Sequence, residues 1–126
     1  MRKAISIETA AKPGASYSQG IIANGFLFTG GFGPFEPGTG NLIGEDIVTQ
    51  TRQTLKNLEA VLASQGLDFS DVVKVTAHLA NAKRDFADYD KVYREFFVEP
   101  YPARTTVGSE LGIILVEIDL VAALRI

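Results

Sequence analysis

The pattern of hydrophobic and polar residues predicts a hairpin near the start of the chain. Two short apolar runs, residues 21–23 and 26–28, flank Asn24-Gly25. Because Asn-Gly tolerates positive φ angles at both central positions of a type I′ turn, this segment is predicted to be a β-hairpin. The following residues, 30–40, contain five glycines and two prolines, which favours a loop.

Two later segments repeat hydrophobic residues at the spacing of a helix with one buried face. The first covers residues 46–64, and Gly66 supplies its C-terminal stop. The second covers residues 85–97 and carries its repeat mainly on aromatic side chains, namely Phe86, Tyr89, Val92, Tyr93 and Phe96. Pro100 and Pro102 then end that helix and begin an extended segment.

Two further strands follow from the pattern. Residues 73–79 alternate between apolar and polar side chains, which is typical of a half-buried strand. Residues 113–124 are almost continuously apolar, which suits a central strand. The predicted order is therefore β-β-α-β-α-β-β, an α+β fold in which a single sheet carries two helices packed on one face. Residues 1–126 are expected to form a single domain, since this length leaves no room for a second.

Composition and charge exclude several classes of protein. The chain has no cysteine and one histidine, so it offers neither a disulfide, a thiolate ligand nor a two-histidine metal site. Its 12 basic residues are scattered and outnumbered by 15 acidic ones, and the net charge of -3 disfavours nucleic-acid binding. No stretch approaches the ~20 apolar residues of a membrane span, and the first residues show no secretory signal. A cytoplasmic location without a membrane partner is expected.

Two acidic residues interrupt the last apolar segment. Glu117 and Asp119 are two positions apart and therefore point to the same face of the predicted strand. Because glutamate is rarely buried unless it is paired, Glu117 needs a cation, a hydrogen-bond partner or a wet cavity. Either this face is simply solvated, or the two acids together raise the pKa of one of them and make it a proton carrier.

Arg104 and His78 are the other candidates for chemistry. Arg104 lies at the start of an extended, β-branched stretch, where a fixed guanidinium can bind a carboxylate through two hydrogen bonds. The simpler alternative is an ordinary salt bridge, for instance to Glu117. His78 lies on the polar face of its strand, and we expect it to be solvated or hydrogen-bonded rather than catalytic.

Four short motifs follow one another along the chain: Tyr17-Ser18-Gln19-Gly20, Thr29-Gly30-Gly31, Pro102-Ala103-Arg104-Thr105 and Val116-Glu117-Ile118-Asp119. In this order and spacing they resemble the RidA/YjgF family of reactive-intermediate (enamine/imine) deaminases, over essentially the whole chain. The Pro-Ala-Arg element combined with a glutamate in the last strand is the fairly specific part of the resemblance. Either element alone would be weak.

The resemblance implies a chorismate-mutase-like α+β fold that assembles as a homotrimer with three clefts between subunits. It also implies the activity, which is hydrolysis of 2-imino acids and their 2-enamine tautomers to 2-keto acids and ammonia. No metal and no organic cofactor take part in that reaction. An imine is already electrophilic, so a sparse site suffices.

The resemblance also assigns residues to this reaction. Arg104 matches the arginine that binds the substrate carboxylate, and Glu117 matches the glutamate that orients water against the imine carbon. Tyr17 matches a tyrosine that lines the cleft, where its hydroxyl holds the water or the imine nitrogen. The remaining substrate-binding positions are expected to be Gly31, Phe32 and Thr106.

Three positions depart from the common family pattern. Gly30 stands where many members have serine, Thr106 where cysteine is common, and Phe32 where glutamine is frequent. We therefore expect a pocket that is larger beside Gly30 and more apolar beside Phe32. The consequence would be a changed substrate preference rather than a loss of activity, because Arg104 and Glu117 are both present.

Two other functions stay open at this point. One is a non-catalytic trimer that binds small carboxylates such as 2-keto acids. The other is a pathway-specific deaminase of an aminomuconate-like or aminoacrylate-like acid, which extra space at Gly30 would suit. A ribonuclease activity, attributed to some relatives in the family, is disfavoured by the net charge of -3 and the scattered basic residues.

Overall fold

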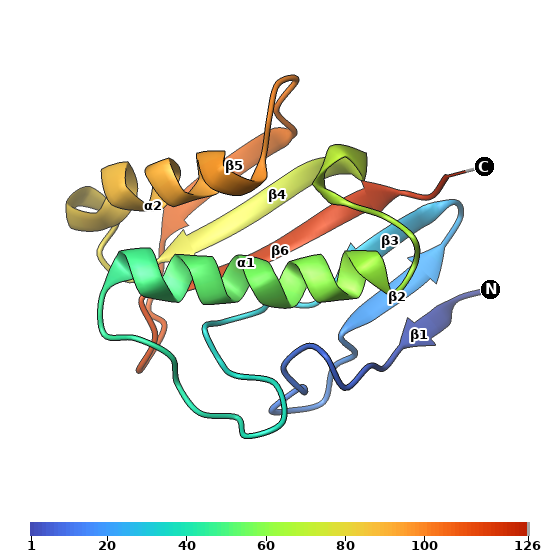
Figure 1. Cartoon of the computed structure of the whole chain (residues 1–126), viewed down its shortest axis with the longest axis horizontal. Coiled ribbons are helices and arrows are strands. Elements are labelled where there is room, and N and C mark those ends of the chain that lie inside the picture. The colour runs from blue at the N-terminus through green and yellow to red at the C-terminus, as the bar shows by residue number, and fades with distance from the viewer. Residues whose placement is uncertain (126) are drawn as a thin grey trace.

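Six β-strands form one mixed sheet, and two helices cover one of its faces (Figure 1). The computed structural model describes residues 1–125. The strands are β1 (Lys3–Ile5), β2 (Gly20–Ala23), β3 (Phe26–Thr29), β4 (Val72–Leu79), β5 (Ala103–Gly108) and β6 (Val116–Ala123). The helices are α1 (Ile47–Ala63) and α2 (Ala82–Phe96), and a 3-10 turn, η1 (Phe69–Asp71), precedes β4. The strands lie in the order β1-β2-β3-β6-β4-β5.

This architecture confirms the predicted fold class and adds one strand at the N-terminal end of the predicted order. The added strand, β1, pairs antiparallel with β2, with Lys3 opposite Ile22. Three residues are too few to show a period of two, so only the pairing with β2 defines this strand. Strands β4 and β5 pair in parallel, because α2 carries the chain from the end of β4 back to the start of β5.

The hairpin and the first helix follow the local chemistry of the sequence. Asn24 and Gly25 have φ angles of 51° and 82° and connect β2 to β3, as a type I′ turn requires. Asp46 caps the N-terminus of α1, because its side chain accepts a hydrogen bond of 2.7 Å from the Thr49 amide. The observed helix ends agree with the predicted range of 46–64 to within one residue.

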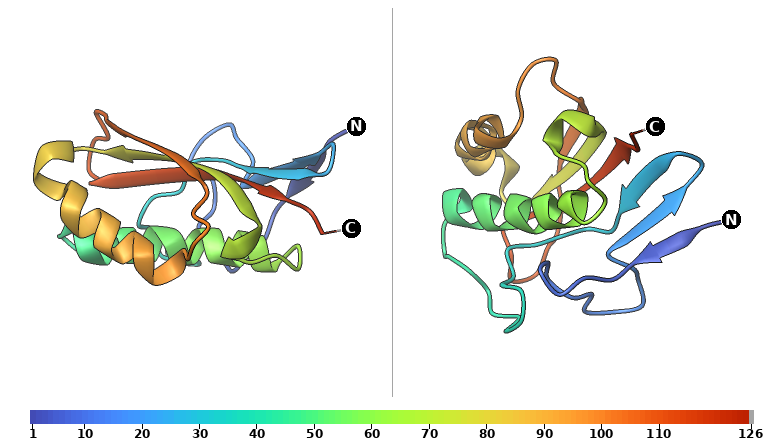
Figure 2. Two further views of the ribbon diagram at one scale, coloured as in Figure 1. Left: turned by 90° about the horizontal axis from the view of Figure 1, so that it is seen from above. Right: turned by 45° about the vertical axis from the view of Figure 1, so that its right-hand side comes forward.

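The two faces of the sheet differ in burial, and this difference positions the candidate site. On β4, three side chains are fully buried beneath the helices: Val75, Ala77 and Leu79. The residues between and before them, Lys74, Thr76 and His78, are only partly covered and point the opposite way. We call the first side the helix face and the second side the open face. Figure 2 shows both helices on the same side of the sheet.

Candidate active site

Glu117 lies on the open face beside the glycine-rich loop that follows β3. It is part of β6 and pairs with His78 of β4. Its carboxyl group packs against Gly31: a Cβ atom at Gly31 would lie 2.9 Å from Glu117 Oε2 and 3.0 Å from Cδ. A side chain at this position would therefore displace the Glu117 carboxylate. The loop therefore forms one wall against the Glu117 side chain.

Tyr17, Gly31, Phe32 and Glu117 line one small hollow of about 60 Å³. The hollow adjoins a wider, open depression of about 460 Å³, and Tyr17 lines both. The Tyr17 hydroxyl accepts a hydrogen bond of 3.3 Å from the Gly14 amide, while nearly half of the residue is exposed. Tyr17 is thus one of the residues shared by the open depression and the small hollow at Glu117.

Buried amide side chains hold the loops around this hollow. Gln19 accepts a hydrogen bond of 2.7 Å from the Ile7 amide and donates one of 3.0 Å to the Ala11 carbonyl. Asn57 of α1 accepts one of 3.0 Å from the Ala11 amide and donates one of 2.9 Å to the Phe35 carbonyl. Because both amides are buried, these hydrogen bonds fix the backbone on two sides of the hollow.

The expected extra space beside Gly30 is wrong. A Cβ atom at Gly30 would lie 2.8 Å from the Ser18 carbonyl oxygen and 3.1 Å from Tyr17 Cδ1. The Tyr17 ring and the Ser18 carbonyl therefore fill the volume that a larger residue would take. Phe32 lines the hollow but is mainly a core residue, since it is 4% exposed and its amide donates to the Ile118 carbonyl at 2.9 Å.

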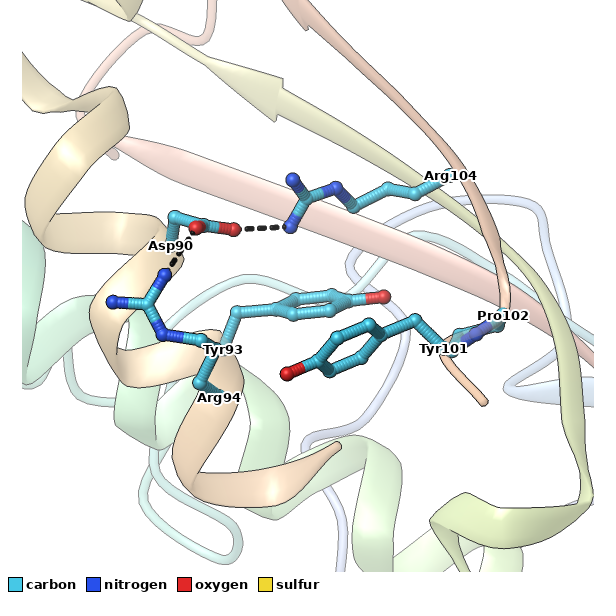
Figure 3. Close-up of a pocket in the computed structure, with 6 residues that line it drawn as sticks. All are labelled: Asp90, Tyr93, Arg94, Tyr101, Pro102 and Arg104. Carbon is cyan, nitrogen blue, oxygen red and sulfur yellow. Dashed lines mark hydrogen bonds and ion pairs between the residues drawn. The ribbon is translucent and has the colours of Figure 1, made fainter. Parts of the chain in front are cut away.

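Arg104 lies in a separate pocket of about 350 Å³ between β5 and α2 (Figure 3). Its Nη1 atom donates a hydrogen bond of 2.7 Å to Asp90 Oδ1. Its guanidinium carbon lies 4.4 Å from the centre of the Tyr93 ring, a cation–π contact. Arg104 thus forms an ordinary salt bridge, one of the two alternatives left open, but its partner is Asp90 and not the suggested Glu117. The pocket is lined by Asp90, Tyr93, Arg94, Tyr101, Pro102 and Arg104.

The surroundings of Arg104 favour its charged form. Burial acts to lower the pKa of the guanidinium, but the hydrogen bond to Asp90 and the neighbouring tyrosines outweigh it, so the pKa is raised. Burial also raises the pKa of the Tyr89 and Tyr93 hydroxyls, which keeps both rings neutral near pH 7. A permanent positive charge supported on neutral aromatic rings is suited to bind a carboxylate.

Within one chain, Arg104 and Glu117 lie on opposite faces of the sheet. Arg104 pairs with Val75, whose side chain is on the helix face, whereas Glu117 pairs with His78, which is on the open face. Side chains of directly paired residues point to the same side of a sheet. One copy of the chain therefore does not bring these two residues into a common site.

Thr106 belongs to the Arg104 side of the sheet. It pairs with Ala77 of the helix face, and its hydroxyl oxygen lies 3.5 Å from that of Tyr89. The predicted site residues thus fall into two groups. The first group is Arg104 with Thr106, and the second is Tyr17, Gly31, Phe32 and Glu117.

His78 and Asp119 share the open face with Glu117. His78 Nδ1 lies 2.6 Å from Ser109 Oγ, so the expected hydrogen-bonded histidine is confirmed. Burial raises the pKa of Asp119, and the nearby charges of His78 and Lys74 oppose that shift. The shift thus comes from burial rather than from repulsion between the two acids, so the proton-carrier hypothesis draws no support from it.

Within residues 1–125, no group of three or more acidic or histidine side chains lies close enough together to hold a metal ion. In the same residues, no helix is both long enough and apolar enough to cross a membrane.

Sequence reasoning missed Asp90 and Asn57, which support the two pockets. Asp90 lies between the aromatic positions of α2, where it looks like an ordinary solvated residue. Its pairing with Arg104 depends on how α2 packs against β5, which no local pattern shows. Asn57 could have been found from the sequence, because it is a polar residue on the buried face of the helix, together with Leu58 and Val61.

The fold and the two pockets define an α+β protein in which one six-stranded sheet presents candidate small-molecule sites on both faces. A family model described as Endoribonuclease L-PSP matches residues 7–124. The chain belongs to this family, which includes the RidA, YjgF and RutC proteins. The resemblance inferred from the four motifs is thereby confirmed.

Three relatives illustrate the likeness. The RutC family protein PH0854 of Pyrococcus horikoshii is 44% identical over 124 residues, which cover 97% of this chain and 98% of that protein. The chloroplastic Reactive Intermediate Deaminase A of Arabidopsis thaliana is 38% identical over 83% of this chain and 56% of that protein. The crystal structure of E. coli TdcF with bound serine matches with a TM-score of 0.89 and 30% identity, covering 98% of this chain and 99% of that one.

Proposed function

We propose that this protein hydrolyses reactive 2-imino acids and their 2-enamine tautomers to 2-keto acids and ammonia. Arg104 binds the substrate carboxylate, Glu117 orients the attacking water, and Tyr17 holds the water or the imine nitrogen. The observation that carries the proposal is the Arg104 guanidinium, which is charged, held on one side by Asp90 and open to a pocket of about 350 Å³. One relative is named a Reactive Intermediate Deaminase, which supports the same chemistry.

Arg104 would supply orientation. Its Nη1 atom is engaged by Asp90, and Figure 3 shows the other terminal nitrogen pointing away from that carboxylate. A planar guanidinium with free donors can hold a carboxylate through two parallel hydrogen bonds. Fixing the carboxylate fixes C2 of the substrate, and such positioning lowers the barrier to attack by water.

Glu117 would orient the attacking water and transfer its protons. The water oxygen adds to C2 while its proton passes to the Glu117 carboxylate, and the imine nitrogen takes up a proton to become an amine. The hydroxyl proton of this carbinolamine then passes to the amine, the C–N bond breaks, and ammonia leaves as the C=O bond of the 2-keto acid forms. An enamine first takes a proton at C3 and loses one from its nitrogen to become the imine. The sum is one imine and one water consumed for one keto acid and one ammonia.

The working site would combine two copies of the chain. Arg104 and Glu117 lie on opposite faces of one sheet, so a site that uses both needs Arg104 from one copy and Glu117 from a neighbour. The open face also carries Phe26 and Phe28, each more than 35% exposed, next to Val121 and Ala123 of β6. An apolar face of this kind is suited to be covered by another subunit. We therefore propose that the sites lie between subunits, and we take the homotrimer and the cytoplasmic location from what the family resemblance and the sequence led us to expect.

The test is imine hydrolysis in a coupled assay. An amino acid oxidase generates 2-imino acids of different side-chain size, and semicarbazide traps the imine that survives. The proposal predicts less trapped imine with the wild type and no such protection with Arg104→Ala. Arg52→Ala is the matched control, since Arg52 is also ion-paired with a helix carboxylate, Glu95, but lies outside both pockets. Equal protection by the wild type and Arg104→Ala would refute the assigned role.

A second candidate is a trimer that binds small carboxylates without chemistry. The serine bound to E. coli TdcF is the observation that favours it. Binding of a 2-keto acid that depends on Arg104, together with no hydrolysis of any imine, would select this candidate. A pathway-specific deaminase would instead show turnover confined to one unsaturated amino acid. RNA cleavage, which the description of the family model names, has no support in the net charge of -3.

A further inference from the structure

Two arginines share one carboxylate in the Arg104 pocket. Asp90 Oδ1 accepts a hydrogen bond of 2.7 Å from Arg104 Nη1, and Asp90 Oδ2 accepts one of 2.7 Å from Arg94 Nη1. Arg94 and Asp90 are one helical turn apart on α2, whereas Arg104 reaches them from β5. Figure 3 shows the Asp90 side chain between the two guanidinium groups.

The charges lining this pocket almost balance. Arg94 and Arg104 contribute two positive charges and Asp90 one negative charge, so the six lining residues sum to one positive charge. One substrate carboxylate neutralises that charge, whereas two would leave an excess negative charge. The excess would be poorly screened, because the side chains of Asp90 and Arg104 are only 23% and 22% exposed.

We propose that Asp90 restricts the site to substrates that carry a single carboxylate, so that monocarboxylic 2-imino acids bind and dicarboxylic ones are rejected. This inference rests on the proposed function, since it takes Arg104 as the residue that binds the substrate carboxylate. Asp90 occupies the place between the two guanidinium groups where a second substrate carboxylate would bind.

The Arg104 pocket would surround an apolar substrate side chain differently from one that carries a second carboxylate. With its carboxylate on Arg104, a substrate side chain extends into a pocket whose other walls are Tyr93, Tyr101 and Pro102. An apolar side chain packs on these rings. A side chain with its own carboxylate can reach Arg94 only beside Asp90, and the two negative charges repel each other. Repulsion of the wrong ligand gives selectivity without strengthening binding of the right one.

The experiment compares two 2-keto acids by isothermal titration calorimetry. 2-Oxobutanoate is the monocarboxylate probe and 2-oxoglutarate the dicarboxylate probe, titrated into the wild type, Asp90→Asn and Asp88→Asn. Asparagine keeps an oxygen that accepts from an arginine but removes the charge. The expected result is that the ratio of the two dissociation constants shifts toward 2-oxoglutarate by about tenfold or more in Asp90→Asn. Asp88→Asn is the matched control, because Asp88 is an exposed residue of the same helix, and its ratio should equal that of the wild type.

Arg94→Ala gives a second variant with the opposite expectation. It removes the second guanidinium and leaves Asp90 charged, so 2-oxoglutarate should bind still more weakly relative to 2-oxobutanoate. A ratio that stays within twofold of wild type in both Asp90→Asn and Arg94→Ala would overturn the inference. Failure of the proposed function would look different, since the wild type and Arg104→Ala would then bind 2-oxobutanoate equally well or not at all. A ratio is insensitive to partial unfolding, because both probes are measured on the same folded fraction.

Discussion

The Arg104 pocket and the Glu117 hollow lie on opposite faces of one sheet and are built in different ways. Side chains of α2 and β5 form the first, and they hold one another by charge and stacking: Asp90, Tyr93 and Arg104. Backbone loops form the second, and buried amides hold them in place. One half of the proposed site therefore depends on neighbouring charges and the other on backbone shape. Substitutions should therefore damage the two halves differently.

Glu117→Gln should give the largest effect, because it should reduce catalysis strongly and leave substrate binding unchanged. This change removes the carboxylate that takes a proton from water, so imine hydrolysis should fall by about 10²–10⁴-fold. Binding of 2-oxobutanoate should stay within twofold of wild type, since Arg104 is intact. Semicarbazide trapping and calorimetry measure the two effects, and Glu110→Gln, at an exposed position, is the control. Activity within threefold of wild type would show that Glu117 does not act on the water.

The next largest effect is expected from adding one methyl group to the loop. In Gly31→Ala the new Cβ would lie 2.9 Å from Glu117 Oε2, so the carboxylate must move. A misplacement of about 1 Å can cost about 10²-fold in rate, so kcat should fall by up to about that factor while 2-oxobutanoate still binds. Gly14→Ala is the matched control, because no atom lies within 4 Å of a Cβ at Gly14. Normal turnover by Gly31→Ala would contradict the described contact.

A smaller effect is expected from Asn57→Ala, which should lower the stability of the protein without changing binding at the Arg104 pocket. Asn57→Ala leaves the Ala11 amide and the Phe35 carbonyl without their buried partner, and we expect a loss of ~1–3 kcal/mol in the free energy of unfolding. Urea denaturation measures this, with the exposed Lys56→Ala as control. The affinity of the folded protein for 2-oxobutanoate should not change. A weakened affinity in Asn57→Ala would mean that the two halves are coupled.

The smallest expected effect concerns pH and the open face. Burial raises the pKa of Asp119 in the folded chain, so its contribution to stability is fully present at low pH and is lost as pH rises through that raised pKa. Asp119→Asn should therefore raise the melting temperature at pH 7 and change it less at pH 3.

The pKa of Asp71 is shifted in the opposite direction to that of Asp119. Its hydrogen bond with Arg125 lowers the pKa of Asp71, so its stabilising contribution is present at neutral pH and is lost as pH falls through that lowered value. Asp71→Asn should lower the melting temperature at pH 7. Thermal denaturation at both pH values tests the pair, and shifts of the same sign in both variants would contradict the account.

Local chemistry made much of the fold predictable, and long-range packing made the rest unpredictable. The turn at Asn24-Gly25 and the N-cap at Asp46 could be read from a few residues, because each depends on its neighbours in sequence. The strand β1 could not, because three residues carry no period and only pairing with β2 defines them.

The same division applies to the candidate site. The family motifs singled out Arg104 and Glu117, but not the faces to which they point. Those faces depend on the register of β4 with β5 and β6, and a shift of one residue would reverse them. Asp90 could not be assigned to Arg104 either, because their contact forms only when α2 packs against β5.

A working site is proposed to take Arg104 from one copy of the chain and Glu117 from another, and an assembly of two different variants can test this. Arg104→Ala and Glu117→Gln, each inactive alone, are co-expressed with different tags, and assemblies carrying both tags are purified. In a trimer that carries both tags, one of the three shared sites receives both intact residues, so about a third of the sites should recover imine hydrolysis. Replacing one partner with the double variant Arg104→Ala/Glu117→Gln should abolish the recovery. Verified mixed assemblies without activity would contradict the shared site.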